Sequence, residues 1–431
     1  MKERLRRWRR NAVVDVTPLR QVPGYRWLFA GMFFAQAGRQ LTVVAVPWQV
    51  FELTGSTLAV GLLGLVQLVP LLVVSLVGGA LADAVNRRRL LVVSQVVLAG
   101  TAAGLLWNST METPLIWPLF VLTAVNAGIS AIDSPARQAL VPGLVGRALL
   151  PSAMALNQTL TNVAKAALPA VGGILIARAG LSFSYGLEVV LFLTSAALIY
   201  RVADPPVEGT VRSFGLSSIL EGLRYLKGRK LIQGTLLIDL NAMVFGMPTA
   251  LFPAIGTEVL GGDASTVGLL YAAPGIGALV GALTSGWVAR VRRQGRAIVL
   301  AVVGWGLAMA VFGLTSSLTL ALIMLAIAGT ADVVSAIFRG TVFQLAAPDA
   351  LRGRLSSIHM AVVAGGPRLG DLEAGVVAAV TSVRFSVVSG GLACVVGALA
   401  IARWAPEFAG YRYQPDDAGP TGPDLAAPAD T

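Results

Sequence analysis

The sequence predicts an all-α membrane protein with twelve transmembrane helices, arranged as two pseudo-symmetric six-helix bundles. Three observations lead to this fold class: a succession of long apolar runs, an uneven distribution of basic residues between them, and an internal repeat. Hydrophobic residues make up 55% of the 431 positions and charged residues only 13%. Such a composition is typical of a chain that lies in a lipid bilayer.

Twelve apolar runs follow one another along the chain. At a rise of about 1.5 Å per residue, each run can form a helix that crosses a hydrocarbon core of about 30 Å. We expect the first run to stay in the mature protein, because it is too long for the core of a signal peptide. The runs lie near 26–52, 58–81, 90–107, 115–136, 152–177, 182–200, 231–257, 266–289, 297–316, 318–341, 355–380 and 385–404.

Basic residues fall almost entirely at the two ends and in every second gap between the runs. These places hold 28 of the 33 Lys and Arg residues, whereas the opposite gaps hold only Arg178 and Arg384. By the positive-inside rule, both termini and the central loop are expected to be cytoplasmic, in a multi-pass protein of the cytoplasmic (inner) membrane. The net charge of +11 then reflects topology. Scattered arginines without interleaved aromatic residues do not favour nucleic-acid binding.

An internal repeat relates the two halves of the chain at an offset of 205 to 207 residues. It implies two bundles related by a pseudo-two-fold axis along the membrane normal, with a cleft between them that suits a solute. The matching residues are Ser130-Ala131-Ile132, Gln138, Pro142 and Gly146-Arg147 in the first half, and Ser335-Ala336-Ile337, Gln344, Pro348 and Gly353-Arg354 in the second.

These patterns divide the chain into five parts. The linker has apolar residues such as Leu220 and Leu223 opposite charged ones such as Glu221 and Arg224, which is typical of an interfacial helix. The expected parts are a cytoplasmic N-terminal segment (1–25), the first six-helix bundle (26–202), a cytoplasmic linker with an amphipathic helix (203–230), the second six-helix bundle (231–404) and a disordered cytoplasmic tail (405–431).

The segment 79–89 resembles the loop 2–3 signature of the major facilitator superfamily. It has the glycine, the acid and the basic cluster of that signature, with Ala84 and Asn86 in place of the usual Arg and Gly. The alternative explanation of the basic cluster is membrane topology alone. The cytoplasmic gate that the resemblance implies consists of Asp83, Arg87, Arg88, Asp133 and Arg137.

Further segments resemble the branch of this superfamily that contains enterobactin exporters and related drug exporters. In addition, Pro169 to Gly173 is similar to the end of the antiporter motif of exporters, although Leu168 stands where that motif has Gly. The resemblance implies export rather than import. The segments that carry it are Leu53 to Ser56, Asp133 to Ala139, Tyr271 to Pro274, Gly281 to Gly286, and Gly370-Asp371.

Charged residues within the apolar runs are candidate functional residues, because a charge at the bilayer centre costs about 2.5 to 3.5 kcal/mol. Arg39, flanked by glutamines, can hold an anionic or catecholate-like group of oxygens. The alternative is a salt bridge from Arg39 to Asp332 or Asp371. The charged residues are Arg39, Lys165, Glu188, Asp239, Asp332, Arg368, Asp371 and Glu373, and the predicted substrate cleft consists of Gln36, Arg39, Gln40, Asn126, Asn241 and Arg368.

Asp239, Asp332 and Asp371 are the candidates for proton coupling. The resemblance places the first two on helices that line the central cleft, where desolvation favours the neutral form of a carboxyl and lets it carry a proton. Asp371 can instead pair with Arg368 on one face of its helix. For His359, the only histidine, a polar residue near a helix end is favoured over a proton relay.

Other chemistries lack support in the sequence. There is no P-loop and no plausible catalytic triad, and Cys394 is the only cysteine, so we expect no enzyme activity, disulfide, metal site or cofactor. We predict a secondary active transporter that exports an enterobactin-like siderophore, or a similar amphipathic small molecule, by alternating access in exchange for protons. A broad-specificity multidrug exporter of the same fold is the alternative, followed by a non-transporting membrane scaffold or sensor. The expected partners are the substrate, the bilayer and protons, and the resemblance implies a monomer.

Overall fold

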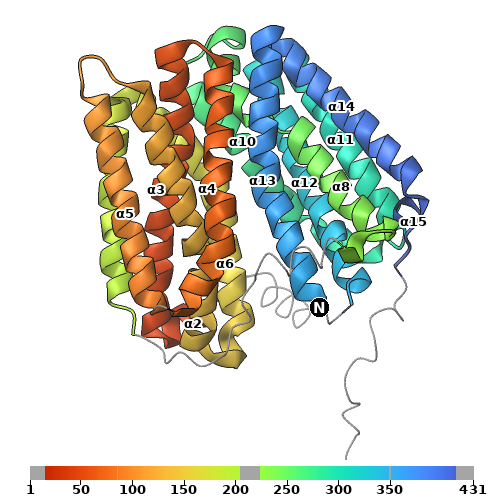
Figure 1. Ribbon diagram of the computed structural model, residues 1–431, viewed down its shortest axis with the longest axis horizontal. Helices are drawn as coiled ribbons and strands as arrows, with labels where there is room; N and C mark the ends of the chain where they lie inside the picture. Colours follow the sequence, from red (N-terminus) through yellow and green to blue (C-terminus); the bar gives the residue numbers. More distant parts are fainter. Residues whose placement is uncertain (1–14, 85, 204–223, 349–350, 414–431) are drawn as a thin grey trace, which may run out of the picture.

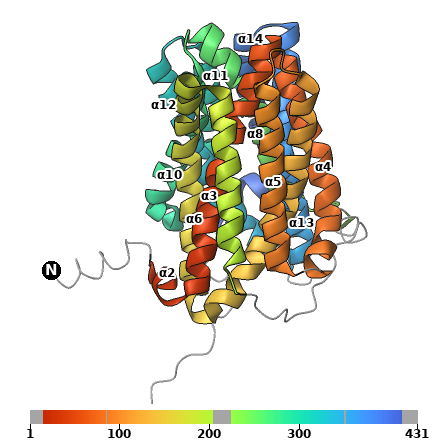
Figure 2. The same cartoon turned by 90° about the vertical axis from the view of Figure 1, so that its left-hand side faces the viewer.

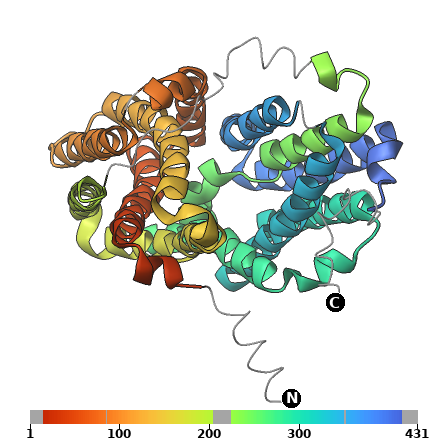
Figure 3. The ribbon, with the colours of Figure 1, turned by 90° about the horizontal axis from the view of Figure 1, so that it is seen from below.

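The chain forms two helical bundles that stand side by side. The computed structural model describes residues 15–84, 86–203, 224–348 and 351–413, and these residues contain helices but no β-strand. The N-terminal bundle is coloured red to yellow and the C-terminal bundle green to blue (Figure 1), and a view from below shows the two groups next to each other (Figure 3). The predicted all-α, two-bundle architecture is confirmed.

The N-terminal bundle contains one helical stretch that is far longer than a membrane is thick. At about 1.5 Å per residue, the 85 residues of α6 would extend about 128 Å if they were straight. Gly146 (φ 70°) and Gly180 (φ 84°) interrupt the helix with positive φ angles, which glycine adopts readily. The chain therefore folds back at these two glycines, so that α6 consists of three arms, which pack beside α3 and α5 (Figure 2). The elements are α2 (Thr17–Gln21), α3 (Pro23–Thr54), α4 (Thr57–Ala84), α5 (Arg87–Ser109) and α6 (Ile116–Tyr200).

The C-terminal bundle is built from separate helices, several of which are short. Its elements are α8 (Lys230–Phe245), η1 (Thr249–Leu251), α9 (Phe252–Ala254), η2 (Ile255–Val259), α10 (Ala264–Leu283), η3 (Ser285–Arg290), α11 (Gln294–Leu314), α12 (Leu318–Ala346), α13 (Arg352–Val380), α14 (Val383–Trp404) and α15 (Pro406–Ala409).

The run expected as one helix near 231–257 is broken in the structure. The helix α8 ends at Phe245, and the chain continues through Gly246 and Pro248 into three short helices. Proline cannot donate the backbone hydrogen bond that a continuous helix needs. The freed carbonyl of Gly246 accepts a hydrogen bond from Trp305 Nε1 at 2.7 Å, so the unwound backbone is satisfied by a side chain. Non-helical backbone within a membrane protein is tolerated where it is buried in this way.

Eight helical segments of the described chain are long and apolar enough to cross a membrane. One of them is α6, which contains three arms. The long helices α3 and α13 are not among the eight, and they carry Arg39 and the pair Arg368 and Asp371, respectively. The exact count of twelve spanning helices therefore stays a prediction.

Some of the five predicted parts lie partly or wholly outside the residues that the structure describes. Most of the expected amphipathic linker helix lies outside the described residues, as do positions 1–14 and 414–431. Of the predicted tail, the structure describes the stretch 405–413, which contains the short helix α15. Its Phe408 is fully buried against α8, and Tyr413 N donates to the Arg292 carbonyl at 2.8 Å.

Glycines bring the two bundles into backbone contact at the end away from α2. A Cβ placed on Gly268 of α10 would lie 2.7 Å from Cα of Gly173 in α6. A Cβ placed on Gly375 of α13 would lie 2.9 Å from Cα of Gly61 in α4. Small residues allow helices to pack this closely in a membrane. Both contacts lie near the start of α4 or α10, so they close the same end of the molecule.

A larger side chain at Gly268 should weaken this closure. In Gly268→Leu the new side chain would meet the Pro169 carbonyl oxygen, which lies 2.5 Å from the Cβ position. Overpacking of this kind destabilises a protein by about 1 to 3 kcal/mol, so we expect a lower melting temperature of the purified protein in detergent. Gly304→Leu is the matched control, because no atom outside the adjacent backbone of its own helix lies within 4 Å of the Cβ position. Equal melting temperatures for the two variants would contradict this account of the interface.

Candidate functional site

Two adjoining cavities lie between the bundles. The first, cavity 1, has a volume of about 480 Å³, and the second, cavity 2, about 390 Å³. Both are lined by Val43 of α3, Thr249 of η1 and Tyr271 of α10, so they form neighbouring parts of one central site. Because Val43 belongs to one bundle and the other two residues to the other, the site lies where the bundles meet.

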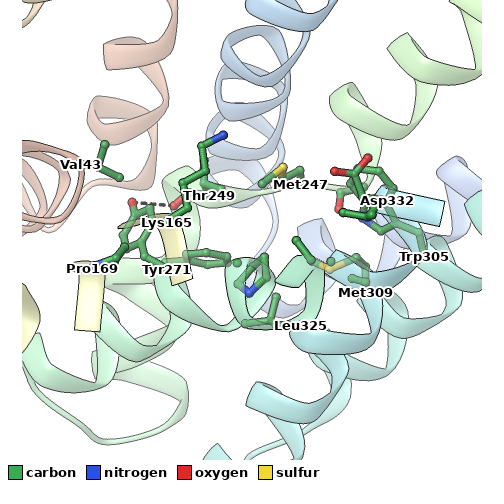
Figure 4. A pocket seen from close by; sticks show the side chains of 18 of the residues that line it. Val43, Lys165, Pro169, Met247, Thr249, Tyr271, Trp305, Met309, Leu325 and Asp332 are labelled. Atoms are coloured by element: carbon green, nitrogen blue, oxygen red, sulfur yellow. Dashed lines mark hydrogen bonds between the residues drawn. The ribbon is translucent and has the colours of Figure 1, made fainter. Parts of the chain in front are cut away.

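Cavity 1 combines apolar walls with one charge of each sign. Lys165 reaches it from α6 and Asp332 from α12, so the two charges come from different bundles (Figure 4). Between Lys165 and Asp332, the cavity walls consist largely of aromatic and methionine side chains. One of the aromatic residues, Tyr271, donates a hydrogen bond to the Thr249 carbonyl at 3.0 Å. These walls are formed by Met247, Phe252, Tyr271, Trp305 and Met309, among others. A few polar groups in an apolar pocket are typical of a site that binds a small molecule.

Cavity 2 is the more polar of the two. It is lined by Arg39, Gln67, Asn126, Arg368 and Asp371. Arg368 Nη1 donates to the Ala364 carbonyl at 2.7 Å, and the structure records no ion pair between Arg368 and Asp371 in the described residues. The pairing that we considered for these two side chains is therefore not the arrangement that the structure shows.

Asp371 instead binds the unwound segment that follows α8. Its Oδ1 accepts hydrogen bonds from Thr249 Oγ1 at 2.5 Å and from the Ala250 N–H at 2.8 Å. A carboxylate that accepts backbone N–H groups at the start of a helix stabilises the helix end. Asp371 thus connects α13 to the broken helix, within the wall of cavity 2.

Most of the predicted cleft residues lie at the two cavities. Gln40 lines cavity 1, whereas Arg39, Asn126 and Arg368 line cavity 2. Gln36 lines neither cavity in the described structure, although it lies on the same helix. Asn241 is also absent from both walls, because its Nδ2 donates to the Cys394 carbonyl at 2.9 Å inside the C-terminal bundle.

Arg39 forms an ion pair, but with a different acid from those we considered. Its Nη2 lies 2.7 Å from Oδ2 of Asp133, rather than near Asp332 or Asp371. Arg137 binds the same carboxylate, and Gln95 Nε2 donates to its other oxygen at 2.8 Å. Asp133 is fully buried, so two of the predicted gate residues, Asp133 and Arg137, belong to a charge centre inside the N-terminal bundle.

A second charge centre lies inside the C-terminal bundle around Arg339. Its guanidinium lies 2.8 Å from Asp239 and 3.6 Å from Asp332, and it donates to Ser335 Oγ at 2.7 Å. His359 Nε2 lies 3.5 Å from Asp239, so the histidine joins this centre instead of standing alone at a helix end. Two of the three candidates for proton coupling, Asp239 and Asp332, therefore meet around one arginine.

Sequence reasoning missed Arg339, because we counted it with the basic residues of a loop. The structure places it in α12 with only 4% of its surface exposed. The internal repeat could have identified Arg339 as a buried charge. Asp133 and Arg339 are 206 residues apart, within the offset of the repeat, so a buried charge in the first half marks the same place in the second.

The predicted gate residues at the end of α4 and the start of α5 bind their own bundle in the structure. Arg87 Nη1 donates to the Ala139 carbonyl at 3.1 Å, and Arg88 Nη1 donates to the Val202 carbonyl at 3.2 Å. Asp83 lies in α4, but its side chain is outside the described structure. The contacts of Arg87 and Arg88 therefore show no latch between the bundles in this conformation.

Removal of the central acid of the N-terminal charge centre should be strongly destabilising. In Asp133→Asn, the half-buried guanidinium groups of Arg39 and Arg137 would lose their shared, fully buried counter-charge. Loss of one partner of a buried ion pair costs about 3 to 5 kcal/mol, so we expect a large drop in melting temperature. Asp263→Asn is a suitable control, because Asp263 is an exposed N-cap and Asn caps a helix equally well. An unchanged melting temperature for Asp133→Asn would refute the structural role of this centre.

Comparisons with known proteins agree with this architecture. A family model described as transmembrane secretion effector matches residues 14–418. The enterobactin exporter EntS of Citrobacter koseri is 31% identical over 393 residues, which cover 91% of this chain and 94% of that relative. EntS of Shigella boydii is 30% identical over 389 residues, which cover 90% and 93%, respectively.

Solved structures share the fold at low sequence identity. A mutant of the nucleoside transporter NupG gives a TM-score of 0.72 at 12% identity, covering 88% of this chain and 99% of that one. A bacterial homolog of the human lysosomal transporter Spinster, inward-facing and unoccupied, gives 0.71 at 15% identity, covering 91% and 98%. The relatives and the fold are those of transporters, not of enzymes. The chain therefore belongs to the transmembrane secretion effector family of the major facilitator superfamily, in the branch of the enterobactin exporters.

Proposed function

We propose that this membrane transporter exports an enterobactin-like siderophore, or a similar amphipathic small molecule, by alternating access and in exchange for protons. The observation that carries the proposal is cavity 1, where aromatic and methionine side chains surround one cation and one acid between the two bundles. The relatives with 30 and 31% identity, which are named enterobactin exporters, support the same substrate class.

Lys165 is the cation best placed to meet an acidic or catecholate-like group of the substrate. It lines cavity 1 and has no acid within ion-pair distance in the described structure, whereas Arg39 is already paired with Asp133. The substrate would thus supply the counter-charge that Lys165 lacks. Gln40 contributes an amide to the same cavity. Arg39, Asn126 and Arg368 extend the proposed site into cavity 2.

The described conformation fits the loading step of an exporter. If both termini are cytoplasmic, as the distribution of basic residues predicts, the α2 end of the molecule faces the cytoplasm. The glycine contacts that involve Gly61 and Gly268 then close the outer end. We infer that Arg87 and Arg88 leave the carbonyl groups of their own bundle when the inner end closes. Together with Asp83, they then bind the other bundle. A monomer in the cytoplasmic membrane is sufficient for this cycle.

Asp332 is a better proton carrier than Asp239. Asp239 has a fully buried side chain at 2.8 Å from Arg339, and His359 lies on its other side. Asp332 lies 3.6 Å from the same arginine, keeps 39% of its side chain exposed and lines cavity 1. A proton can therefore reach Asp332 from the cavity, and Asp239 serves to hold Arg339. Asp371, whose Oδ1 accepts two hydrogen bonds, is the third candidate for the proton carrier.

Deletion of the gene should trap the substrate inside the cell. We expect mass spectrometry of cells and medium to find an iron-responsive siderophore that accumulates in the deletion strain and is secreted again by the complemented strain. The cultures are grown with and without iron. Unchanged siderophore levels together with increased sensitivity to several unrelated drugs would replace this proposal with the multidrug exporter. Unchanged levels of both would favour a scaffold or sensor.

Neutralisation of Asp332 should uncouple transport from pH. In Asp332→Asn we expect substrate export that no longer responds to a pH gradient, because the amide cannot carry a proton, whereas Asp239→Asn should mainly lower stability by leaving Arg339 without its nearest acid. The measurements are gradient-driven transport in proteoliposomes and the melting temperature. An unchanged pH dependence in both variants would exclude these two acids as coupling groups.

A further inference from the structure

We propose that Glu188 is a second proton-binding site, in the N-terminal bundle, and that it exchanges its proton with cavity 2 through the hydroxyl of Thr42. The inference rests on the proposed proton-coupled export. It adds a residue that is distant from the charge centre around Arg339 and belongs to the opposite bundle.

Glu188 is buried and only half satisfied. It lies in the third arm of α6 with 1% of its surface exposed, and its Oε2 has no hydrogen-bond partner among the described residues. Its Oε1 binds Thr42 Oγ1 of α3. A buried polar atom without a partner carries a free-energy penalty, so its retention at this place calls for an explanation.

The other deeply buried acids differ from Glu188 in their partners. Asp133 binds two arginines, and Asp239 binds Arg339 and faces His359. Within the part of the chain that the structure describes, Glu188 has no cation within ion-pair distance. An ionised carboxylate without a counter-charge is very costly in a membrane, whereas the neutral acid is not. A proton is therefore the partner that this site accepts most readily.

The groups that face Glu188 do not supply a counter-charge. On α3, Gln49 accepts a hydrogen bond from Tyr185, which lies one turn before Glu188, and Glu52 is exposed beyond it. Arg39 lies one turn before Thr42 on α3, but it is paired with Asp133. The α5 face that packs against this arm is apolar, and it consists of Leu98, Ala99 and Ala102 against Val189 and Phe192.

Thr42 connects Glu188 to the solvent-accessible site. Thr42 lines cavity 2, and its hydroxyl lies 3.3 Å from the Gly38 carbonyl as well as against Glu188 Oε1. With Glu188 ionised, the hydroxyl donates to the carboxylate. With Glu188 protonated, the acid donates to Thr42 Oγ1, and the hydroxyl donates to the Gly38 carbonyl. Both protonation states are therefore hydrogen-bonded, and the proton passes between Glu188 and cavity 2 through one hydroxyl.

Glu188→Gln separates this role from a structural one, because the amide keeps the shape of the side chain but cannot release a proton. The assay uses acid-interior proteoliposomes, in which the pH gradient drives uptake of radiolabelled enterobactin through inverted molecules. A second assay without a gradient measures exchange of labelled for unlabelled enterobactin. We expect Glu188→Gln to lose gradient-driven uptake and to keep exchange, and Glu188→Asp to keep both.

Thr42→Val tests the route of the proton, because it removes the hydroxyl and nearly preserves the volume of the side chain. We expect slower gradient-driven uptake and normal exchange in this variant. Glu52→Gln is the matched control, an exposed acid near the same end of α3, and it should behave like the unmodified protein. Gradient-driven uptake by Glu188→Gln at the unmodified rate would overturn the inference. If the unmodified protein showed neither uptake nor exchange of enterobactin, the proposed substrate would fail instead.

Discussion

The fully buried carboxylate of Asp133 binds two arginines, one from α3 and one from its own helix, and both arginine side chains are mostly covered by protein. An uncompensated charge at such a depth would cost several kcal/mol. The carboxylate therefore determines how α3 and the first arm of α6 must lie relative to each other. Because Arg39 also forms part of the wall of cavity 2, the ion pair that stabilises the bundle also positions a charged group at the central site.

The C-terminal bundle contains a similar charge centre, in which a central arginine is bound by acids. The repeat places Arg339 where the first half has Asp133, and its closest acid, Asp239, comes from the first long helix of that bundle, as Arg39 does in the N-terminal one. In both centres, the central charge is therefore paired with residues of its own bundle. These ion pairs can stay intact when the two bundles move relative to each other, as in the proposed alternating access.

Contact between the bundles relies on other means, namely close backbone packing and an interrupted helix. Gly173 and Gly268 allow α6 and α10 to touch, while the chain after α8 unwinds at Gly246 and Pro248. Asp371 and Trp305 bind the unwound backbone from neighbouring helices. Small residues and a break in a helix permit a cavity at membrane depth, because side chains replace the hydrogen bonds that the helix has lost.

The sequence alone determined the features that follow from periodicity and transfer energy. Apolar runs, the basic residues between them and the repeat were sufficient to predict the helical membrane fold and the two bundles. The expectation of an exporter of this superfamily came from the resemblance of short motifs such as 79–89 and 169–173 to those of known members. The sequence also identified the costly charges, including Glu188 and Asp332, because a charge within an apolar run is visible without any structure.

Only the tertiary structure decided which charges meet. The pairing of Arg39 with Asp133, 94 residues apart, depends on how two helices pack side by side, and no local pattern encodes that distance. The same holds for Asp371, for which Arg368, one turn away, was a possible partner and which binds the unwound segment after α8 instead. Each polar side chain can bind either a residue one turn away on its own helix or a residue on a neighbouring helix. The packing of the whole bundle decides which of the two becomes its partner.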